Sequence, residues 1–323
     1  MEKPICIVCG EKKVEYLTSD FWWYFQEFEL VKCEGCLSHF IDPSKVDKSI
    51  YDKIYEGGIN KWYERYAQYA ESILKQKKPL LWLAHREPAY GLIFEYLKNK
   101  VKENSVKILE VWCGLWYMTY ALNKAWYHCK GIDLSTNAVE KAKNRFGDFY
   151  EAIEVDKIKE WQYDVVIATE VIEHIDQPSI FLRSCYKTLK KWWVCLITTP
   201  NKDFWHKQAY RGSDLPPVHV SWISHQWLYH LWKQNTSAQN TEVIDRLPAN
   251  YFDIWYNLFF LRLFYLKQKL QSHSIIMETN ESQANRFSLK NRIIESKLIK
   301  YVSNFFYLLF GFQTESHLLA VKK

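Results

Sequence analysis

Glycine is scarce in this sequence: 10 of 323 residues, about 3%, against roughly 7% in average proteins. Tryptophan is abundant instead, with 15 residues. Turns, helix ends and close approaches of the backbone need glycine, because it has no Cβ atom. We therefore expect that some tryptophans of the printed sequence stand where the cellular protein has glycine.

The sequence also lacks the marks of a secreted or membrane-spanning protein. Its first residues, Met-Glu-Lys-Pro-Ile-Cys, do not form the apolar run of a signal peptide. The apolar stretch from Tyr251 to Leu266 is too short and too polar to cross a bilayer. A net charge of +6, spread along the chain, does not demand a nucleic-acid partner. These absences predict a cytoplasmic protein.

Four of the eight cysteines form two C-x-x-C pairs near the N-terminus. Two residues between thiolates let one tight turn direct both sulfurs at a single ion, and two such turns complete a closed tetrahedral zinc site. Two disulfides or a redox pair are the alternatives, which a reducing cytosol and the lack of a thioredoxin-like βαβ pattern disfavour. We predict a structural zinc ion bound by Cys6, Cys9, Cys33 and Cys36.

From residue 106 onward, short apolar strands alternate with amphipathic helices. This alternation is typical of an α/β fold with a doubly wound, mostly parallel sheet and helices on both faces. Ligands of such sheets bind outside the carboxyl ends of the strands, where the strand order reverses. Strands are expected at 106–111, 130–133, 163–169 and 194–199, and helices at 117–125, 137–146 and 179–190.

The segment after the first strand reads Ile-Leu-Glu-Val-Trp-Cys-Gly-Leu-Trp, from Ile108 to Trp116. With glycine at 112 and 116 it becomes E-x-G-x-G-x-G, a turn that reverses tightly and approaches a nucleotide closely. As printed, only Gly114 keeps this pattern. The turn therefore indicates a nucleotide site whose glycines are partly replaced.

Other tryptophans also stand where chain geometry favours glycine. One follows a helix in Lys-Ala-Trp-Tyr, and two fill a helix-to-strand turn in Leu-Lys-Lys-Trp-Trp-Val. A genetic code that reads UGA as glycine, translated with a table that reads it as tryptophan, would produce this pattern. We predict glycine in the cell at Trp112 and Trp116, and Trp126, Trp192 and Trp193 are further candidates.

Three polar residues fall at carboxyl ends of the expected strands: Glu110, Asp133 and Thr169. Asp133 lies 23 residues after Glu110, a placement from which an acidic residue accepts hydrogen bonds from the ribose hydroxyls of a nucleotide. A helix-capping role for Asp133 is the alternative, and Ser135 competes for it. Because the turn, the acidic strand end and the strand order occur together, we expect a nucleotide-type cofactor here.

Residues 106–200 resemble the class I S-adenosylmethionine (SAM) dependent methyltransferases. Besides the turn, the match rests on Glu-Val-Ile-Glu-His at 170–174 and on the Trp-Trp-Val-Cys-Leu-Ile-Thr-Thr-Pro-Asn run that ends at 201. The whole chain is similar to the group in which a zinc-ribbon knuckle precedes this domain. The resemblance implies a seven-stranded Rossmann-like sheet, SAM as the cofactor and methyl transfer as the activity. It assigns cofactor contacts to Glu110, Trp112, Gly114, Trp116, Asp133, Leu134 and Thr169, and with tryptophan at 112 and 116 we expect poor binding or none.

The resemblance also points to acceptor-side chemistry. The spacing E-x-x-E-H puts Glu170 beside Glu173 and His174 on one side of a helical turn. Related ubiquinone-type and RNA 3′-end 2′-O-methyltransferases use such a motif with a later histidine, here His219, to hold a divalent ion. Magnesium or another divalent ion would lower the pKa of the acceptor. A general-base role for His174 without metal, and a purely structural Glu–His pair, remain open.

The chain is expected to divide into five parts: a zinc-ribbon knuckle at 1–45, a helical linker or lid at 46–100, the SAM-binding core at 101–250, a helical insertion or lid at 251–313, and a final sheet strand at 314–323. Apolar stretches in the insertion leave a peripheral membrane contact open. We expect a small-molecule or glycan-type acceptor, methylated at oxygen, because no long basic strip with exposed aromatics favours nucleic acid. The alternatives are a metal-assisted RNA 3′-end 2′-O-methyltransferase and, with genuine tryptophans, a catalytically inactive binding module.

Overall fold

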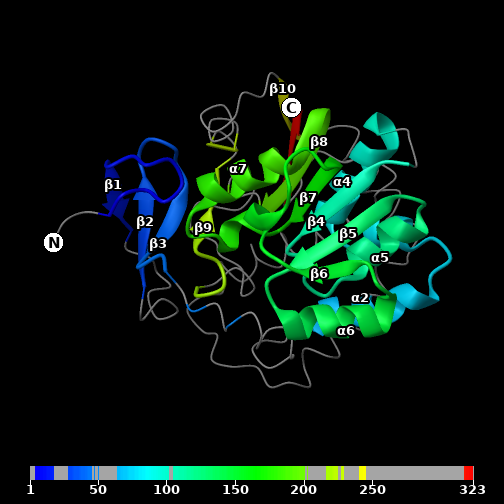
Figure 1. The fold of residues 1–323 in the computed structure, drawn as a ribbon. Helices are drawn as coiled ribbons and strands as arrows, with labels where there is room; N and C mark the ends of the chain where they lie inside the picture. Colours follow the sequence, from blue (N-terminus) through cyan, green and yellow to red (C-terminus); the bar gives the residue numbers. More distant parts are fainter. Residues whose placement is uncertain are drawn as a thin grey trace, which may run out of the picture.

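The computed structural model describes residues 4–17, 28–45, 47, 50, 64–101, 105–200, 202, 216–224, 227–228, 240–244 and 316–322. Within these residues the strands form one seven-stranded sheet and one four-stranded sheet. Figure 1 shows the smaller sheet, built mainly from N-terminal strands, beside the larger sheet and its helices.

The large sheet has the strand order β10-β11-β8-β7-β4-β5-β6. Neighbouring strands from β8 to β6 are parallel, whereas β11 is antiparallel to both β8 and β10. This order confirms the mostly parallel, seven-stranded sheet expected from the sequence. The strands are β4 Lys107–Val111, β5 His128–Asp133, β6 Tyr150–Ala152, β7 Tyr163–Thr169, β8 Leu189–Pro200, β10 Asn240–Ile244 and β11 Ser316–Lys322.

Side chains of the central strands alternate between two apolar layers, one on each face of the sheet. On β7, Val165 and Ile167 enter the first layer, and Val166 and Ala168 enter the second. Because both faces are buried, the strands read as continuous apolar runs. The first layer includes side chains of α2 Glu64–Ser72, α3 Pro79–Ala84, α4 Pro88–Lys100, α5 Tyr117–Lys124 and α6 Thr136–Phe146, and the second includes those of α7 Pro178–Thr188.

Local sequence sets the ends of several helices. Helices α3, α4 and α7 each have proline in the first turn, where its missing N–H costs nothing. Ser135 precedes α6 as its N-cap, and its Oγ accepts a hydrogen bond from the Ala138 N–H (3.2 Å); the helix ends before Gly147, with φ of 103°. Ser135 is therefore the cap, which leaves the Asp133 carboxylate to other partners.

The small sheet, here called the ribbon, has the antiparallel order β1-β2-β3-β9. Its strands are β1 Val14–Tyr16, β2 Glu29–Cys33, β3 His39–Asp42 and β9 Ser221–Trp222. Strand β9 comes from the segment expected to belong to the core at 101–250, and it pairs with His39 and Phe40 of β3. Phe40 is buried in the same apolar layer as α7. The ribbon is thus joined to the rest of the chain by the pairing of β9 with β3 and by packing in the layer that contains α7.

Part of the sequence expectation for the C-terminal third lies outside the described residues. This applies to the helical insertion at 251–313 and to its proposed membrane contact. Strand β11 occupies the place of the expected last strand. No helix in the described part of the chain is long and apolar enough to cross a membrane.

Candidate functional site

The turn between β4 and α5 lies where the strand order reverses, since β4 has β5 on one side and β7 on the other. Three alternate residues of this turn have left-handed φ: Trp112 at 54°, Gly114 at 52° and Trp116 at 68°. These are the three glycine positions of the pattern E-x-G-x-G-x-G. The backbone therefore follows the course that three glycines would take, although only one glycine is present.

Asp133, at the end of β5, holds this turn in place. Its Oδ2 accepts a hydrogen bond from the Gly114 N–H (3.2 Å), and its Oδ1 accepts one from the Ser135 N–H (3.1 Å). An ionised carboxylate has about four lone-pair sites, so each oxygen can accept a further hydrogen bond. The Asp133 carboxylate is therefore suited to receive hydroxyl donors beside the turn.

The Glu110 carboxyl group faces α5 instead. Thr119 Oγ1 donates a hydrogen bond to Glu110 Oε2, and Glu110 is buried. Burial raises the pKa of Glu110 to about 8; hydrogen bonds from Thr119 oppose the shift, and the charge of Asp133 adds to it. Of the acidic residues expected at the cofactor, the structure brings Asp133 to Gly114 and places the Glu110 carboxyl against a helix.

The remaining residues expected at the cofactor lie at the same edge of the sheet. Leu134 follows Asp133 directly and is 36% exposed. Thr169 is the last residue of β7, and its buried Oγ1 has no hydrogen-bond partner among the described residues. Both positions border the turn, because β5 and β7 flank β4.

A second group of polar side chains, here called the Glu–His–His cluster, consists of Glu173, His174 and His219. Their potential ligand atoms all lie within 4.8 Å of one another. The two imidazole rings meet edge to face with centroids 4.6 Å apart, and His174 Nε2 lies 3.9 Å from Glu173 Oε1. The cluster thus joins three of the four residues expected on the acceptor side.

Backbone groups and one hydroxyl fix this cluster. His174 Nδ1 lies 2.6 Å from the Val218 carbonyl oxygen. Because a carbonyl oxygen only accepts, we assign the proton to Nδ1, which leaves a lone pair on Nε2. The Val220 N–H donates to the Glu173 carbonyl (2.9 Å), and Thr199 Oγ1 donates to Glu173 Oε2 (2.9 Å). The cluster therefore offers nitrogen and carboxylate lone pairs, which bind either a cation or a proton.

Glu170 stands apart from the Glu–His–His cluster. It has a left-handed φ of 52°, and its N–H donates to Thr198 O (3.1 Å) and Thr198 Oγ1 (3.0 Å). The short 3₁₀ helix η5, Ile172–His174, begins only after it. Side chains at i, i+3 and i, i+4 become neighbours only in a continuous helix. Because the helical segment starts after Glu170, the expected helical turn from Glu170 to His174 is not formed.

Sequence reasoning missed the residues that support this cluster. Thr199 donates to Glu173 from the end of β8, and its only sequence signal was a polar residue at a strand end. Val218 and Val220 act through backbone atoms, so their side-chain types carry no signal. Their role depends on where the chain returns in space.

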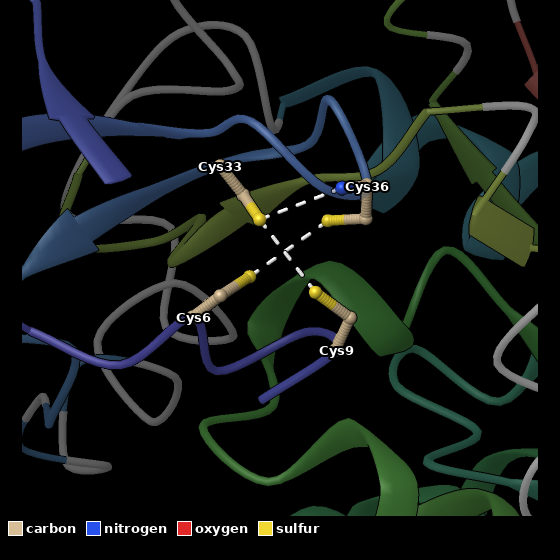
Figure 2. A group of neighbouring side chains, drawn as sticks. All are labelled: Cys6, Cys9, Cys33 and Cys36. Atoms are coloured by element: carbon tan, nitrogen blue, oxygen red, sulfur yellow. Dashed lines mark hydrogen bonds between the residues drawn. The ribbon is translucent and has the colours of Figure 1, made fainter. Parts of the chain in front are cut away.

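The four paired cysteines converge on one point (Figure 2). Cys6 Sγ and Cys36 Sγ are 3.8 Å apart, and Cys9 Sγ and Cys33 Sγ are 3.6 Å apart. A disulfide needs about 2.05 Å. Four zinc–sulfur bonds of about 2.3 Å in a tetrahedron place neighbouring sulfurs about 3.8 Å apart. The cysteines are thus free, and their spacing fits a tetrahedral ion.

The thiols of this cysteine cluster differ in pKa. A hydrogen bond from Cys36 lowers the pKa of Cys6 to about 6, whereas burial raises the pKa of Cys9 to about 12. The Cys36 N–H also donates to Cys33 Sγ (3.5 Å). Four crowded, largely buried sulfurs favour a bound cation, because it makes thiolates of all four.

A family model described as a methyltransferase domain matches residues 63–236, more than half of the chain. The matched region contains the turn, Asp133 and the Glu–His–His cluster. The ribbon strands β1 to β3 precede it.

Relatives of the chain include ubiquinone biosynthesis O-methyltransferases. The protein of Psychrobacter arcticus is 25% identical over 176 residues, which are 50% of this chain and 65% of that protein. The protein of Neisseria meningitidis is 27% identical over 122 residues, 35% of this chain and 51% of that protein. The chain therefore spans only part of the length of these relatives.

Similar solved structures include a SAM dependent methyltransferase from Archaeoglobus fulgidus, with a TM-score of 0.42 and 12% identity, covering 72% of this chain and 94% of that one. Phosphoethanolamine N-methyltransferase 2 of Haemonchus contortus has a TM-score of 0.44 and 14% identity, covering 72% and 51%. These scores carry no argument about the substrate.

Proposed function

This chain belongs to the methyltransferase domain family, and from that premise we propose that it is a SAM-dependent methyltransferase. The observation that carries the proposal is the contact between the Asp133 carboxylate and the Gly114 N–H at the reversal of strand order. This contact joins the acidic strand end to the glycine-type turn, as a nucleotide site of this fold class requires.

Methyl transfer requires the protein to position the acceptor atom and to remove its proton. SAM supplies a methyl group on a positively charged sulfonium sulfur, and an acceptor atom displaces that sulfur in line. In our proposal Asp133 accepts hydrogen bonds from the ribose hydroxyls. His174 Nε2 takes the proton of the acceptor hydroxyl, since its Nδ1 is already committed to Val218. With SAM bound, the methyl group would pass from its sulfur to the acceptor oxygen, and His174 would keep the proton.

We propose a small-molecule or glycan-type hydroxyl as the acceptor. Support for oxygen and for a small molecule comes from the relatives named ubiquinone biosynthesis O-methyltransferase. The modest net charge of +6 gives no support to a nucleic-acid acceptor.

A transfer assay tests this function. The purified chain, with tryptophan and with glycine at 112 and 116, is incubated with methyl-labelled SAM and phenolic compounds, sugars or RNA with a 3′-terminal ribose. We expect label in a small molecule or sugar with the glycine form. Label confined to the RNA end would favour the RNA methyltransferase. Calorimetry that shows no SAM binding by either form would contradict the proposal and favour an inactive binding module.

A second candidate, metal-assisted methyl transfer, is favoured by the Glu–His–His cluster. One carboxylate and two imidazoles form a donor set that suits a divalent ion with open positions. Glu173, His174 Nε2 and His219 would hold it, and the ion would supply a Lewis acid that lowers the pKa of the acceptor hydroxyl. Full activity after metal removal would exclude this candidate. A response to magnesium or manganese that is lost in Glu173→Gln would establish it.

We also propose that the cysteine cluster binds a structural zinc ion. Its support is the convergence of four sulfurs, with 3.8 Å between Cys6 Sγ and Cys36 Sγ and 3.6 Å between Cys9 Sγ and Cys33 Sγ. A Cys₄ site has no open position, so its contribution is to folding and not to catalysis.

A further inference from the structure

Tryptophan dominates the left-handed backbone positions of this protein. Left-handed backbone is nearly free of strain only for glycine, and for a bulky residue it is a genuine outlier. Seven described residues other than glycine have positive φ, and besides Leu37 and Glu170 all are tryptophans: Trp112, Trp116, Trp126, Trp161 and Trp192. The other described tryptophans, Trp82, Trp193, Trp222 and Trp227, are not in this group.

Trp126 has the surroundings of a helix-ending glycine. It follows Ala125, the last cap residue of α5, and has φ of 68°. Its N–H donates to the Asn123 carbonyl (3.1 Å), and the Tyr127 N–H donates to the Leu122 carbonyl (3.2 Å). This pair of bonds is the Schellman motif, whose left-handed residue is usually glycine. Trp126 is 78% exposed, so burial of the indole ring does not explain it.

Trp161 lies in the turn before β7, and Trp192 lies within β8. Trp192 has φ of 70° and is 80% exposed, where the pairing of β7 with β8 shifts register between Tyr163 and Val165. Trp161 has φ of 62° and is 47% exposed. The backbone at both places has the left-handed φ typical of glycine, and both side chains are exposed.

Two other tryptophans are buried and have no left-handed backbone. Trp222 and Trp227 are 5% and 1% exposed, and each packs in an apolar cluster. Both lack positive φ. Their side chains therefore serve the core, and their backbone makes no demand for glycine.

We infer that positions 112, 116, 126, 161 and 192 are glycine in the cellular protein, whereas 222 and 227 are tryptophan. Trp161 joins the set on backbone geometry alone. Trp193 is not included among the inferred glycines, because a strand position without positive φ suits tryptophan as well as glycine. A genetic code in which UGA specifies glycine accounts for the division: UGA stands at the five positions and UGG at the other two.

This inference changes the cofactor turn. With glycine at 112 and 116 the turn reads Glu-Val-Gly-Cys-Gly-Leu-Gly, and its three left-handed residues all lack a side chain. Trp116 is 6% exposed, so its removal frees volume inside the structure beside the turn. The consequence for SAM rests on the proposed function, whereas the backbone argument does not.

The codons and the native protein decide the inference. We expect UGA at the five positions and UGG at 222 and 227. Tandem mass spectrometry of protein from the source cell should show glycine masses at the five positions and tryptophan masses at the other two. Tryptophan in the five native peptides would overturn the inference. Neither the codons nor the peptide masses depend on methyl transfer. Failure of this inference is therefore distinguishable from failure of the proposed function.

Thermal unfolding of recombinant protein gives a second test. The form with glycine at the three exposed positions, 126, 161 and 192, should unfold at a higher temperature than the printed chain, because three strained residues are relieved and no buried side chain is lost. The matched control, Trp222→Gly with Trp227→Gly, should unfold at a lower temperature, because two core side chains are lost. An equal or lower unfolding temperature for the three-glycine form would overturn the inference at these positions.

A separate set of contacts links the ribbon to the Glu–His–His cluster. The segment 218–224 contacts η5 through the bonds of Val218 and Val220 described above. On its other side the Val220 carbonyl accepts a hydrogen bond from the Ile41 N–H (3.1 Å), and Ser221 and Trp222 pair with β3. The segment thus lies between the ribbon and η5.

Ser224 ties this segment to the cysteine cluster. Its Oγ donates to the Cys36 carbonyl (2.6 Å), and its N–H donates to Ser38 Oγ (3.1 Å). Ser224 Oγ also accepts a hydrogen bond from the Trp227 N–H (3.2 Å). Ser224 is 2% exposed, so water cannot readily replace these bonds.

We propose that Ser224 is a positioning residue through which the cysteine cluster holds His219 in the Glu–His–His cluster. The geometry of this link is independent of the proposed function, but its catalytic meaning rests on it. Removing the Ser224 hydroxyl should release the segment that carries His219, without changing the turn between β4 and α5 or its contact with Asp133.

Imidazole NMR and kinetics test the link. In Ser224→Ala we expect shifted His174 and His219 ring signals and a several-fold lower kcat, with unchanged SAM affinity. Ser224→Thr, which keeps the hydroxyl, should restore both. Unchanged ring signals in Ser224→Ala would overturn the proposal. The ring signals decide it even if the chain transfers no methyl group.

Discussion

Five tryptophans with left-handed backbone would cost this fold roughly 5–15 kcal/mol, since each such residue costs about 1–3 kcal/mol. The whole free energy of unfolding of a typical domain is also about 5–15 kcal/mol. Three of the five are exposed: Trp126 and Trp192 leave most of the side chain in solvent, and Trp161 about half. Glycine at these positions removes a cost that the fold could hardly carry.

Asp133 is the residue on which cofactor affinity should depend. In Asp133→Ala, with glycine at 112 and 116, we expect SAM binding to weaken by about 1.5–3 kcal/mol, the range for hydrogen bonds to a charged group. Calorimetry measures the change, and circular dichroism controls for the loss of the Gly114 and Ser135 contacts. Unchanged affinity in a folded variant would contradict the assignment of Asp133 to the ribose.

The buried carboxyl group of Glu110 should make stability depend on pH. Burial raises its pKa in the folded state to about 8, above the ordinary value of 4.5. Between these values the unfolded chain releases a proton that the folded chain keeps, so the free energy of unfolding falls as pH rises from 4.5 toward 8. At about 1.4 kcal/mol per pKa unit, the fall is a few kcal/mol.

The variant Glu110→Gln isolates this effect, because its amide oxygen can still accept the Thr119 hydroxyl. Urea unfolding at about pH 5 and about pH 8.5 should show a smaller fall in stability for the variant than for the parent chain. Equal slopes in the two proteins would show that Glu110 ionises normally in the folded state.

His174 should affect the chemical step and not cofactor binding. We expect His174→Ala to lower the methyl-transfer rate by about 10²–10⁴-fold, the usual contribution of a general acid–base group. SAM affinity should stay within a few-fold, because the cluster is formed by other residues than Asp133. An unchanged rate would return His174 to a structural role.

At the level of elements, the ribbon depends on its cysteine cluster. Three ribbon strands are only three to five residues long, and β9 has two, so the sheet has few apolar contacts of its own. Elemental analysis should find one zinc ion per chain, and Cys33→Ser should lose it. Cys185→Ala, outside the cluster, should retain it. Free thiols without zinc after cytosolic expression in zinc-replete medium would contradict this prediction.

At the level of the whole molecule, the ribbon and the large sheet should not unfold independently. Phe40 and Val8 pack in the same apolar layer as Leu182 of α7, and β9 completes the ribbon from the other side. We expect deletion of residues 1–45 to lower the unfolding temperature of the remaining chain and to expose Trp227 to fluorescence quenchers. The full chain treated with a chelator is the control. A truncated chain with the unfolding temperature of the full chain would show an independent ribbon.

The sequence alone determined the features that local pattern encodes. The spacing of Cys6, Cys9, Cys33 and Cys36 predicted that the four thiols converge on one point, because two tight turns suffice. Apolar periodicity indicated the parallel strands, and the glycine-type pattern located the turn beside Asp133. These features need only neighbours along the chain.

Only the tertiary structure decided contacts between distant segments. It brought His219 to His174, joined β9 to the ribbon and turned the Glu110 carboxyl toward Thr119. It also separated Glu170 from the cluster, through a left-handed residue that no periodicity indicates. Such contacts depend on packing and on backbone dihedrals, which residue type restricts but does not specify. For the same reason Trp161 became a glycine position only when its φ was known.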